Sequence, residues 1–179
     1  MRLQVIYGKV LEEASTFLAP RYGVDMANWL DDEEMQAWRS LVDVQSAIHA
    51  ALEAELLARH SITEGEYGVL VMLSEAPERQ LRMCDLASIL HLSPSGLTRR
   101  LDRLVREGFV TREPWVDDRR VTMASLSEIG LQKLAKAAPD HVDGVRRHFL
   151  DHLTRPQIRA LGAALLSVKH GRASAADRI

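Results

Sequence analysis

The fold is decided by residues 93–110, which read SPSGLTRRLDRLVREGFV. Ser93 is a typical helix N-cap, and a proline in the next position costs nothing because the first helical N–H has no partner. Leucines at 97, 101 and 104 then repeat at helical spacing and define one apolar face. Gly108 is a typical left-handed helix end. The stretch therefore predicts a helix that starts at Ser93, buries its leucines and stops just before Gly108.

The face opposite these leucines carries hydroxyls and arginines. At about 100° per residue, with Leu97 at zero, Ser95 falls near about 160° and Arg99 near about 200°. Small side chains allow a helix backbone to approach base edges, and an arginine can bond guanine bidentately. Ser93 and the helix N-terminus can hold a phosphate. This face is typical of a helix that enters the major groove, although an ordinary solvated face is also polar.

The neighbouring segments favour the DNA-binding interpretation. A short helix over 83–90 and a turn at 91–92 come before, and two β-like runs, 109–112 and 121–126, come after. Two short helices, a tight turn and a β-hairpin define a winged helix-turn-helix. The hairpin tip carries Arg119 and Arg120, which can reach phosphates or a minor groove. We expect Asp117 or Asp118 to orient one of these arginines.

Long helices are predicted on both sides of this head. One begins at Asp31 with acids in its first turn, where the helix dipole favours negative charge, and ends near His60. Its apolar stripe consists of Trp38, Leu41, Ile48, Leu52 and Leu56. The stripes over 34–58 and 156–169 exceed what one small head can bury. They therefore predict a second copy of the chain as their cover.

Capping boxes and prolines set the remaining boundaries. Thr63–Glu66 opens a second helix, which Pro77 closes, and Thr154–Gln157 opens the last helix, which follows a helical stretch after Ser127. We expect a kink or break at Pro139 because proline removes a backbone hydrogen bond.

The predicted fold is mainly α with a small β-hairpin wing, a winged helix-turn-helix whose N- and C-terminal helices form a dimerisation domain. Residues 62–126 form the DNA-binding domain, and 31–61 with 127–171 form the helical dimerisation region. Residues 1–30 are an N-terminal extension, and 172–179 a C-terminal tail.

Composition bounds the alternatives. The chain has 179 residues, of which 46% are hydrophobic and 27% charged, which suits a packed protein. No apolar run is long enough to span a membrane and no signal peptide is recognisable, so a cytoplasmic protein is expected. A single cysteine, Cys84, excludes an intrachain disulfide. The net charge of −2 does not indicate DNA binding, but residues 93–120 hold seven arginines against five acids.

The ordered motifs resemble the multiple-antibiotic-resistance regulator (MarR) family. The resemblance rests on Leu86-Ala87, the stretch 93–104, Gly108-Phe109-Val110, the tip 117–120 and the junction 126–130. It implies a triangular homodimer on a palindromic operator in double-stranded DNA. Such a protein is often a repressor released by a small-molecule effector or an oxidant. By position, Ser95, Thr98, Arg99 and Arg103 would meet the major groove and Arg119 the minor groove. The predicted DNA-binding set is Ser93, Ser95, Thr98, Arg99, Arg103, Arg119 and Arg120.

Other residues were weighed for metal binding, thiol sensing, ligand binding and catalysis, and each of these roles has weaker support than DNA binding. His148 and His152 share a helix face at metal-ligand spacing, but no third ligand is adjacent, so neither a metal nor a cofactor is predicted. A metal-responsive regulator of the same fold stays an alternative. Cys84 is expected to be a partly buried structural residue, with a thiol sensor as the alternative. Trp38 and Tyr67 are candidates for a ligand pocket. No catalytic motif is present, so an enzyme is not expected. A winged-helix adaptor that never binds DNA remains the alternative from another class.

Overall fold

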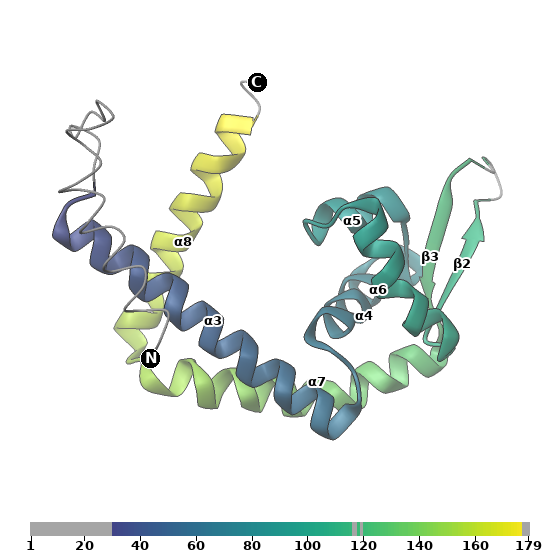
Figure 1. Ribbon diagram of the computed structural model, residues 1–179, viewed down its shortest axis with the longest axis horizontal. Coiled ribbons are helices and arrows are strands. Elements are labelled where there is room, and N and C mark those ends of the chain that lie inside the picture. Colours follow the sequence, from purple (N-terminus) through teal and green to yellow (C-terminus); the bar gives the residue numbers. More distant parts are fainter. Residues whose placement is uncertain (1–29, 116–117, 119, 177–179) are drawn as a thin grey trace, which may run out of the picture. The chain divides into compact units, whose positions relative to one another are not determined.

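The computed structural model describes residues 30–115, 118 and 120–176 (Figure 1). Contacts divide the chain into two compact units between Gln45 and Ser46, within the first described helix, and each unit is described by itself. The predicted N-terminal extension, residues 1–30, lies outside the described residues except for Leu30.

Helix α3, Asp32–His60, begins and ends where the sequence predicts. At its start the Asp31 N–H donates to the Glu34 carboxylate at 2.9 Å, and the Glu34 N–H donates to the Asp31 carboxylate at 2.8 Å. This reciprocal cap explains the acids of the first turn. In the first unit the stripe residues Trp38 and Leu41 are 56% and 46% exposed. In the second unit Leu52 and Leu56, further along the same stripe, are buried.

The core of the second unit is built from α4 (Glu64–Glu75), α5 (Met83–Ile89), α6 (Pro94–Arg106) and α7 (Glu128–His148). The capping box predicted for α4 is present: the Glu66 N–H donates to Thr63 Oγ1, and the Thr63 N–H donates to the Glu66 carboxylate. The core consists of Leu56, Ile62, Tyr67, Val69, Leu70, Leu73, Leu86, Ala87, Leu97, Leu101, Leu104, Val110, Ala124, Leu126, Leu134 and Ala137.

The sheet has three antiparallel strands in the order β1-β3-β2. The predicted hairpin is present as β2 (Val110–Pro114) and β3 (Thr122–Leu126), and it projects from the helices in Figure 1. Strand β1 (Gln80–Arg82), which follows the short 3₁₀ turn Pro77–Arg79, was not predicted. It pairs with β3 so that Leu81 faces Ala124 across the ladder. Three residues are too few to show an alternating pattern.

Helix α7 runs unbroken through Pro139, so of the predicted kink or break the break is wrong. Pro139 and Ala135, whose carbonyl loses its helical partner, are both exposed, and water can therefore satisfy that carbonyl. The chain turns instead at Phe149, which leaves helical geometry before the 3₁₀ segment Leu150–His152.

Helix α8, Arg155–Ala176, closes the described chain, so the predicted tail starts inside a helix. Its start is only half of the predicted capping box, because Gln157 Oε1 accepts from both the N–H and the hydroxyl of Thr154. None of residues 155–172 is buried. Within the described part of the chain, no helix is both long and apolar enough to cross a bilayer.

Candidate nucleic-acid interface

The turn between α5 and α6 has the geometry that the sequence predicts. His91 occupies the left-handed region, with φ of 52°, which reverses the chain between the helices. Ser93 caps α6: its backbone is extended and its Oγ accepts the Gly96 N–H at 3.1 Å. The same Oγ lies 3.2 Å from the Ser95 hydroxyl. The first turn of α6 therefore presents two neighbouring serine hydroxyls at the surface.

The outer face of α6 presents Ser95, Thr98 and Arg99, all exposed, while Leu97, Leu101 and Leu104 are buried. The Thr98 hydroxyl donates to the Pro94 carbonyl at 2.9 Å, so the threonine is fixed on the helix surface and its oxygen can still accept. Arg99 makes no ion pair with any described residue. Its guanidinium remains available to an outside acceptor.

Arg103 differs from the other predicted DNA contacts because it is already bound inside the chain. Its Nη1 donates to the Glu66 carboxylate at 3.0 Å, and its Nη2 donates to the Ser61 carbonyl. Glu66 is 5% exposed, and it is the one charged residue buried among the described residues. From the sequence, Glu66 was predicted only as part of a capping box, and its pairing with Arg103 was missed.

The wing brings Arg120 to the surface beside Asp118. The Asp118 carboxylate accepts the Arg120 backbone N–H at 3.0 Å, and the Asp118 carbonyl accepts the Val121 N–H at 2.9 Å. Asp118 therefore shapes the turn through the backbone, and the expectation that Asp117 or Asp118 orients one of the two arginines stays a prediction. Arg119 and Asp117 lie outside the described residues.

Two side-chain contacts connect the wing to the rest of the head. Arg112 on β2 pairs with Asp102 on α6 at 2.9 Å, and Arg82 of β1 lies 4.7 Å from the centre of the Trp115 ring. The first contact joins the wing to α6 and the second joins the end of β2 to β1. Both α6 and the hairpin thus belong to one connected surface.

Comparison with known proteins agrees with this geometry. Residues 62–122 match the family model described as the MarR family. The structure is similar to that of AbsC, a MarR family transcriptional regulator from Streptomyces coelicolor, with 37% sequence identity and a TM-score of 0.75. The similarity covers 82% of this chain and 99% of AbsC. The chain belongs to the MarR family.

Two further relatives are informative. Sco3205 of Streptomyces coelicolor, a family member whose structure is in complex with DNA, is 35% identical over 80% of this chain and 91% of its own, with a TM-score of 0.75. The transcriptional repressor YetL of Bacillus subtilis is 25% identical over 87% of this chain and 89% of its own. The MarR-family chain is thus a transcriptional regulator and not an enzyme.

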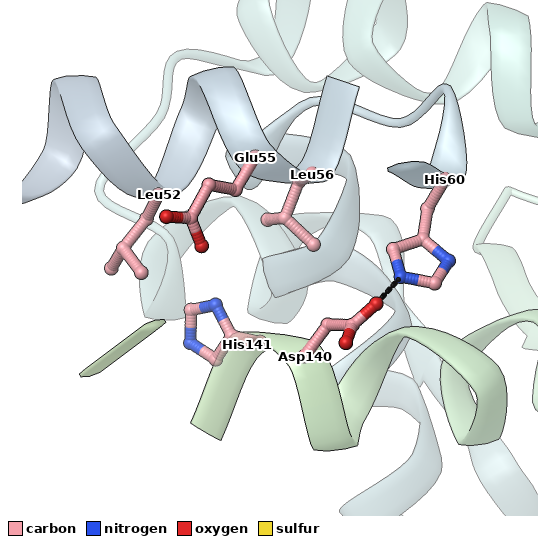
Figure 2. A pocket seen from close by; sticks show the side chains of 6 residues that line it. All are labelled: Leu52, Glu55, Leu56, His60, Asp140 and His141. Carbon is pink, nitrogen blue, oxygen red and sulfur yellow. Dashed lines mark hydrogen bonds and ion pairs between the residues drawn. The ribbon is translucent and has the colours of Figure 1, made fainter. Parts of the chain in front are cut away.

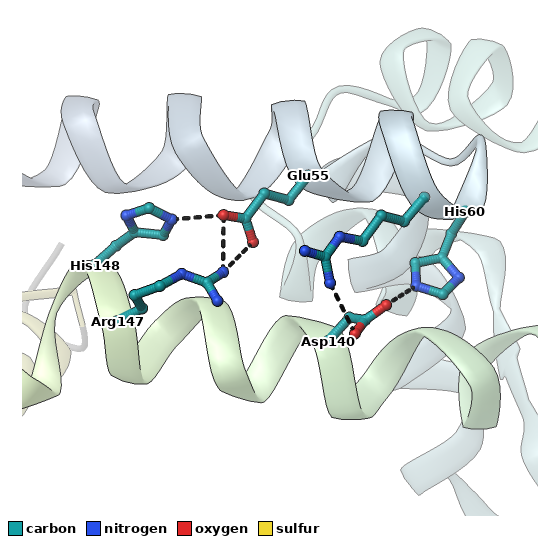
Figure 3. Close-up of polar contacts among 6 residues, drawn as sticks. Glu55, His60, Asp140, Arg147 and His148 are labelled. Carbon is teal, nitrogen blue, oxygen red and sulfur yellow. Dashed lines mark hydrogen bonds and ion pairs between the residues drawn. The ribbon is translucent and has the colours of Figure 1, made fainter.

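In this MarR-family regulator, carboxylates connect the end of α3 to α7 (Figure 3). Asp140 pairs with His60 at 2.8 Å and with Arg59 at 3.1 Å. The hydrogen bond from His60 is the main cause that lowers the pKa of Asp140. Glu55 pairs in the same way with His148 and with Arg147, each at 2.7 Å, and the His148 hydrogen bond lowers the pKa of Glu55.

His141 lies beside these pairs but has no hydrogen-bond partner for its Nδ1 (Figure 2). The space that it shares with Leu52, Leu56 and Glu55 has no room for a water molecule. Its ring packs on Tyr67 with the ring centres 4.4 Å apart. Burial lowers the pKa of His141, so the neutral ring is the form that suits this site.

The two residues predicted for a ligand pocket belong to different units, and a pocket role for either stays a prediction. Tyr67 is 8% exposed and belongs to the core, whereas Trp38 is exposed in the other unit. An open groove of about 470 Å³ lies elsewhere, against the start of α4. Most of its lining residues are polar or charged: His49 pairs with Glu64 at 2.7 Å, and Glu53 accepts the Glu64 N–H. The lining residues are His49, Ala50, Glu53, Thr63, Glu64, Gly65 and Arg100.

Cys84 and the histidines considered as metal ligands are not part of a metal-binding cluster among the described residues. Among the described residues, no three His, Cys, Asp or Glu side chains are grouped so as to hold a metal ion. His148 is instead bonded to Glu55. Cys84 is exposed, contrary to the partly buried position expected, and its Sγ lies 3.6 Å from the Asp85 carboxylate. A sensing role for Cys84 stays a prediction.

Proposed function

We propose that this chain binds double-stranded DNA by placing α6 in the major groove and the wing against the adjacent backbone. The observation that carries the proposal is the outer face of α6, where Ser95, Thr98 and Arg99 are exposed above a fully buried leucine face. An arginine and small hydroxyls at the start of a helix are suited to base edges and phosphates. The DNA complex of Sco3205, a relative similar over most of its length, supports the same assignment.

The DNA-bound form that we propose is a homodimer on a palindromic operator. Apolar side chains along α8, including Leu165, Leu166 and Val168, are about half exposed in the single chain. A second copy provides the natural cover for such a face, because most homo-oligomers are symmetric and use the same surface twice. Two heads related by a two-fold axis read a sequence with the same symmetry.

We further propose that the regulator acts as a repressor and that a small molecule releases it. The name of the relative YetL, a transcriptional repressor, supports the first part. The groove at the start of α4 supports the second, because Arg100 of α6 and His49 and Glu53 of α3 line it together. A ligand in this groove would contact the DNA-reading helix directly.

The test begins with a duplex that the wild-type protein selects from a random-sequence pool. A scrambled version of that duplex serves as the reference. We expect Arg99→Ala to weaken binding to the selected duplex by about 1–3 kcal/mol while leaving the scrambled duplex nearly unaffected. Arg119→Ala and Arg120→Ala should weaken both duplexes by similar factors, because phosphate contacts carry no sequence information. Fluorescence anisotropy at fixed, moderate salt measures each affinity.

Arg79→Ala is the matched control, because it removes an arginine whose partner, Glu128, is also exposed and lies outside α6 and the wing. It should bind both duplexes as the wild type does. If the arginine variants of α6 and the wing bind no differently from this control, the DNA assignment is wrong and the adaptor alternative gains. Titrating the bound complex with candidate effectors, with Arg100→Ala as comparison, then tests the groove.

A further inference from the structure

We infer that Arg103 is a positioning residue, which fixes α6 to the corner between α3 and α4 and does not itself read DNA. The inference rests on the proposed function, because it concerns how the DNA-reading helix is held. It reassigns a residue that the sequence pattern and the family resemblance both place at the major groove.

Both terminal nitrogens of Arg103 are already used within the chain. Nη1 donates to the Glu66 carboxylate at 3.0 Å, and Nη2 donates to the carbonyl of Ser61. Ser61 follows the last residue of α3 and has a left-handed φ of 52°, so the chain leaves helical geometry at this residue. A bidentate grip on a guanine uses two guanidinium N–H groups. Each Nη of Arg103 keeps one further N–H, but the two internal bonds fix the guanidinium against Ser61 and Glu66, so a base contact would have to be made from there or break these bonds.

Glu66 makes that exchange costly. Its side chain is 7% exposed, and the Thr63 N–H at 2.8 Å is its other hydrogen-bond donor. A buried carboxylate that loses its cation retains the cost of its lost hydration. The Arg103 guanidinium is therefore needed beside Glu66 to balance the charge of the buried carboxylate. Through this ion pair, α6 is held to the first turn of α4.

Arg100, one helical turn before Arg103 on the same side of α6, lies against the same corner. Its guanidinium covers Gly65, where a Cβ atom would come within 2.6 Å of Arg100 Cζ. The arginines of α6 thus form two groups: 100 and 103 face α4, whereas 99 and 106 are exposed. Spacing alone does not explain the division, because Arg103 is three residues from both Arg100 and Arg106; the contacts of Arg103 with Glu66 and Ser61 decide its side.

The pair acts on sequence preference more than on total affinity. Reading a base requires the helix to be held within about half an ångström of its productive position. Attraction to phosphates tolerates larger errors in the position of the helix, because it is electrostatic and independent of the base sequence. Loosening α6 should therefore lower the affinity ratio between the selected and scrambled duplexes.

The deciding experiment compares Arg103→Met, Glu66→Gln and the double variant with the full-length wild type, using the selected and scrambled duplexes. The two single variants change the charge of the protein in opposite directions. A positioning role predicts that both lower the preference ratio, by about tenfold each, and that the double variant loses no more than the larger single loss. It also predicts that Arg103→Met keeps the wild-type dependence of affinity on salt, because no phosphate contact is lost.

A direct DNA contact predicts a different pattern. Arg103→Met would then weaken binding and reduce the salt slope by about one, whereas Glu66→Gln would leave or improve binding. That result overturns the inference while the proposed function stands. If the wild type itself prefers no duplex, the proposed function fails and this inference with it. Anisotropy is measured well below the thermal midpoint of each variant, and Arg79→Met, which breaks another arginine–glutamate pair, should change nothing.

Discussion

Helix α6 of the DNA-binding head and helix α8 are both rich in leucine, but their leucines are buried to very different extents. In α6, Leu97, Leu101 and Leu104 are 0–1% exposed. In α8, Leu165 and Leu166 are 47% and 54% exposed, and none of residues 155–172 is buried. Both helices have leucines at helical spacing, so spacing alone does not distinguish a core within the chain from a face that needs a partner.

The difference teaches where the stability of each region comes from. The head gains hydrophobic free energy within one chain, at about 25 cal/mol for each Å² of apolar surface buried. Helix α8 gains little in this way until another surface covers it. If the proposed homodimer supplies that surface, the stability of α8 depends on protein concentration and that of the head does not.

The largest effect is expected for Leu70→Ala in the head. Leu70 is fully buried in α4, and removing its side chain leaves a cavity in the core. We expect the free energy of unfolding to fall by about 2–5 kcal/mol. Urea denaturation should show the same loss at low and at high protein concentration. A loss that vanishes on dilution would place Leu70 at an interface between chains.

The next effect is expected for Leu165→Glu in α8. A charge on this half-exposed position costs little in a single chain, but it would be buried in the proposed dimer. We expect the free energy of dimerisation to become less favourable by about 2 kcal/mol, so that the dissociation constant of the dimer rises roughly thirtyfold. Analytical ultracentrifugation measures it, with Arg159→Glu on the same helix as a control for added negative charge. If Leu165→Glu dimerises as the wild type does, α8 is not the interface.

The sequence predicted most of the head because its signals are local. Thr63 with Glu66, Ser93 with Pro94, and Gly108 each set a helix boundary through contacts within a few residues, and all are confirmed. Strand β1 was missed because it exists only through pairing with β3, some forty residues later. The break at Pro139 was wrong because the cost of proline depends on whether water can reach the carbonyl that it leaves unbonded.

The candidate site was predicted only in part, for a related reason. Helical angles placed Ser95 and Arg99 outward and the family resemblance added Thr98; all three are exposed in the structure. The same angles could not show that Arg103 bends toward Glu66, since a long side chain reaches several neighbours from one position. The ligand-pocket candidates Trp38 and Tyr67 were chosen as aromatics and stay a prediction, whereas the groove for which we propose an effector includes Glu53, Glu64 and Arg100 in its lining.

A smaller effect on the head is expected from pH. Burial lowers the pKa of His141 from its ordinary 6.5, so the unfolded chain binds a proton there more readily than the folded chain. The contribution is fully present above pH 6.5 and is lost as the pH falls through the window below it. Asp140 and Glu55, whose pKa values are lowered from 3.8 and 4.5, add a second loss below about pH 4.

The measurement compares unfolding of the wild type with that of His141→Phe between pH 8 and pH 5, about the range over which a histidine titrates. Phenylalanine keeps a ring against Tyr67 but cannot bind a proton. The wild type should lose stability faster toward low pH, by at most about 1.4 kcal/mol for each pH unit. Parallel pH profiles would show that His141 is not the titrating group.

The smallest expected effect is that of glycine-to-alanine substitutions, whose sign can differ between the head and α8. Gly68 in α4 and Gly162 in α8 are both helical, and a Cβ atom added at either would meet nothing within 4 Å in the single chain. Alanine is favoured over glycine inside a helix by about 0.5–1 kcal/mol, so Gly68→Ala should stabilise the protein by that amount. Gly162→Ala should do the same only if α8 is bare. Where a partner helix packs closely on Gly162, the added methyl instead meets that partner, and the gain disappears or reverses as protein concentration rises. Thermal unfolding of both variants across a concentration series therefore reports whether the exposed face of α8 is covered in solution.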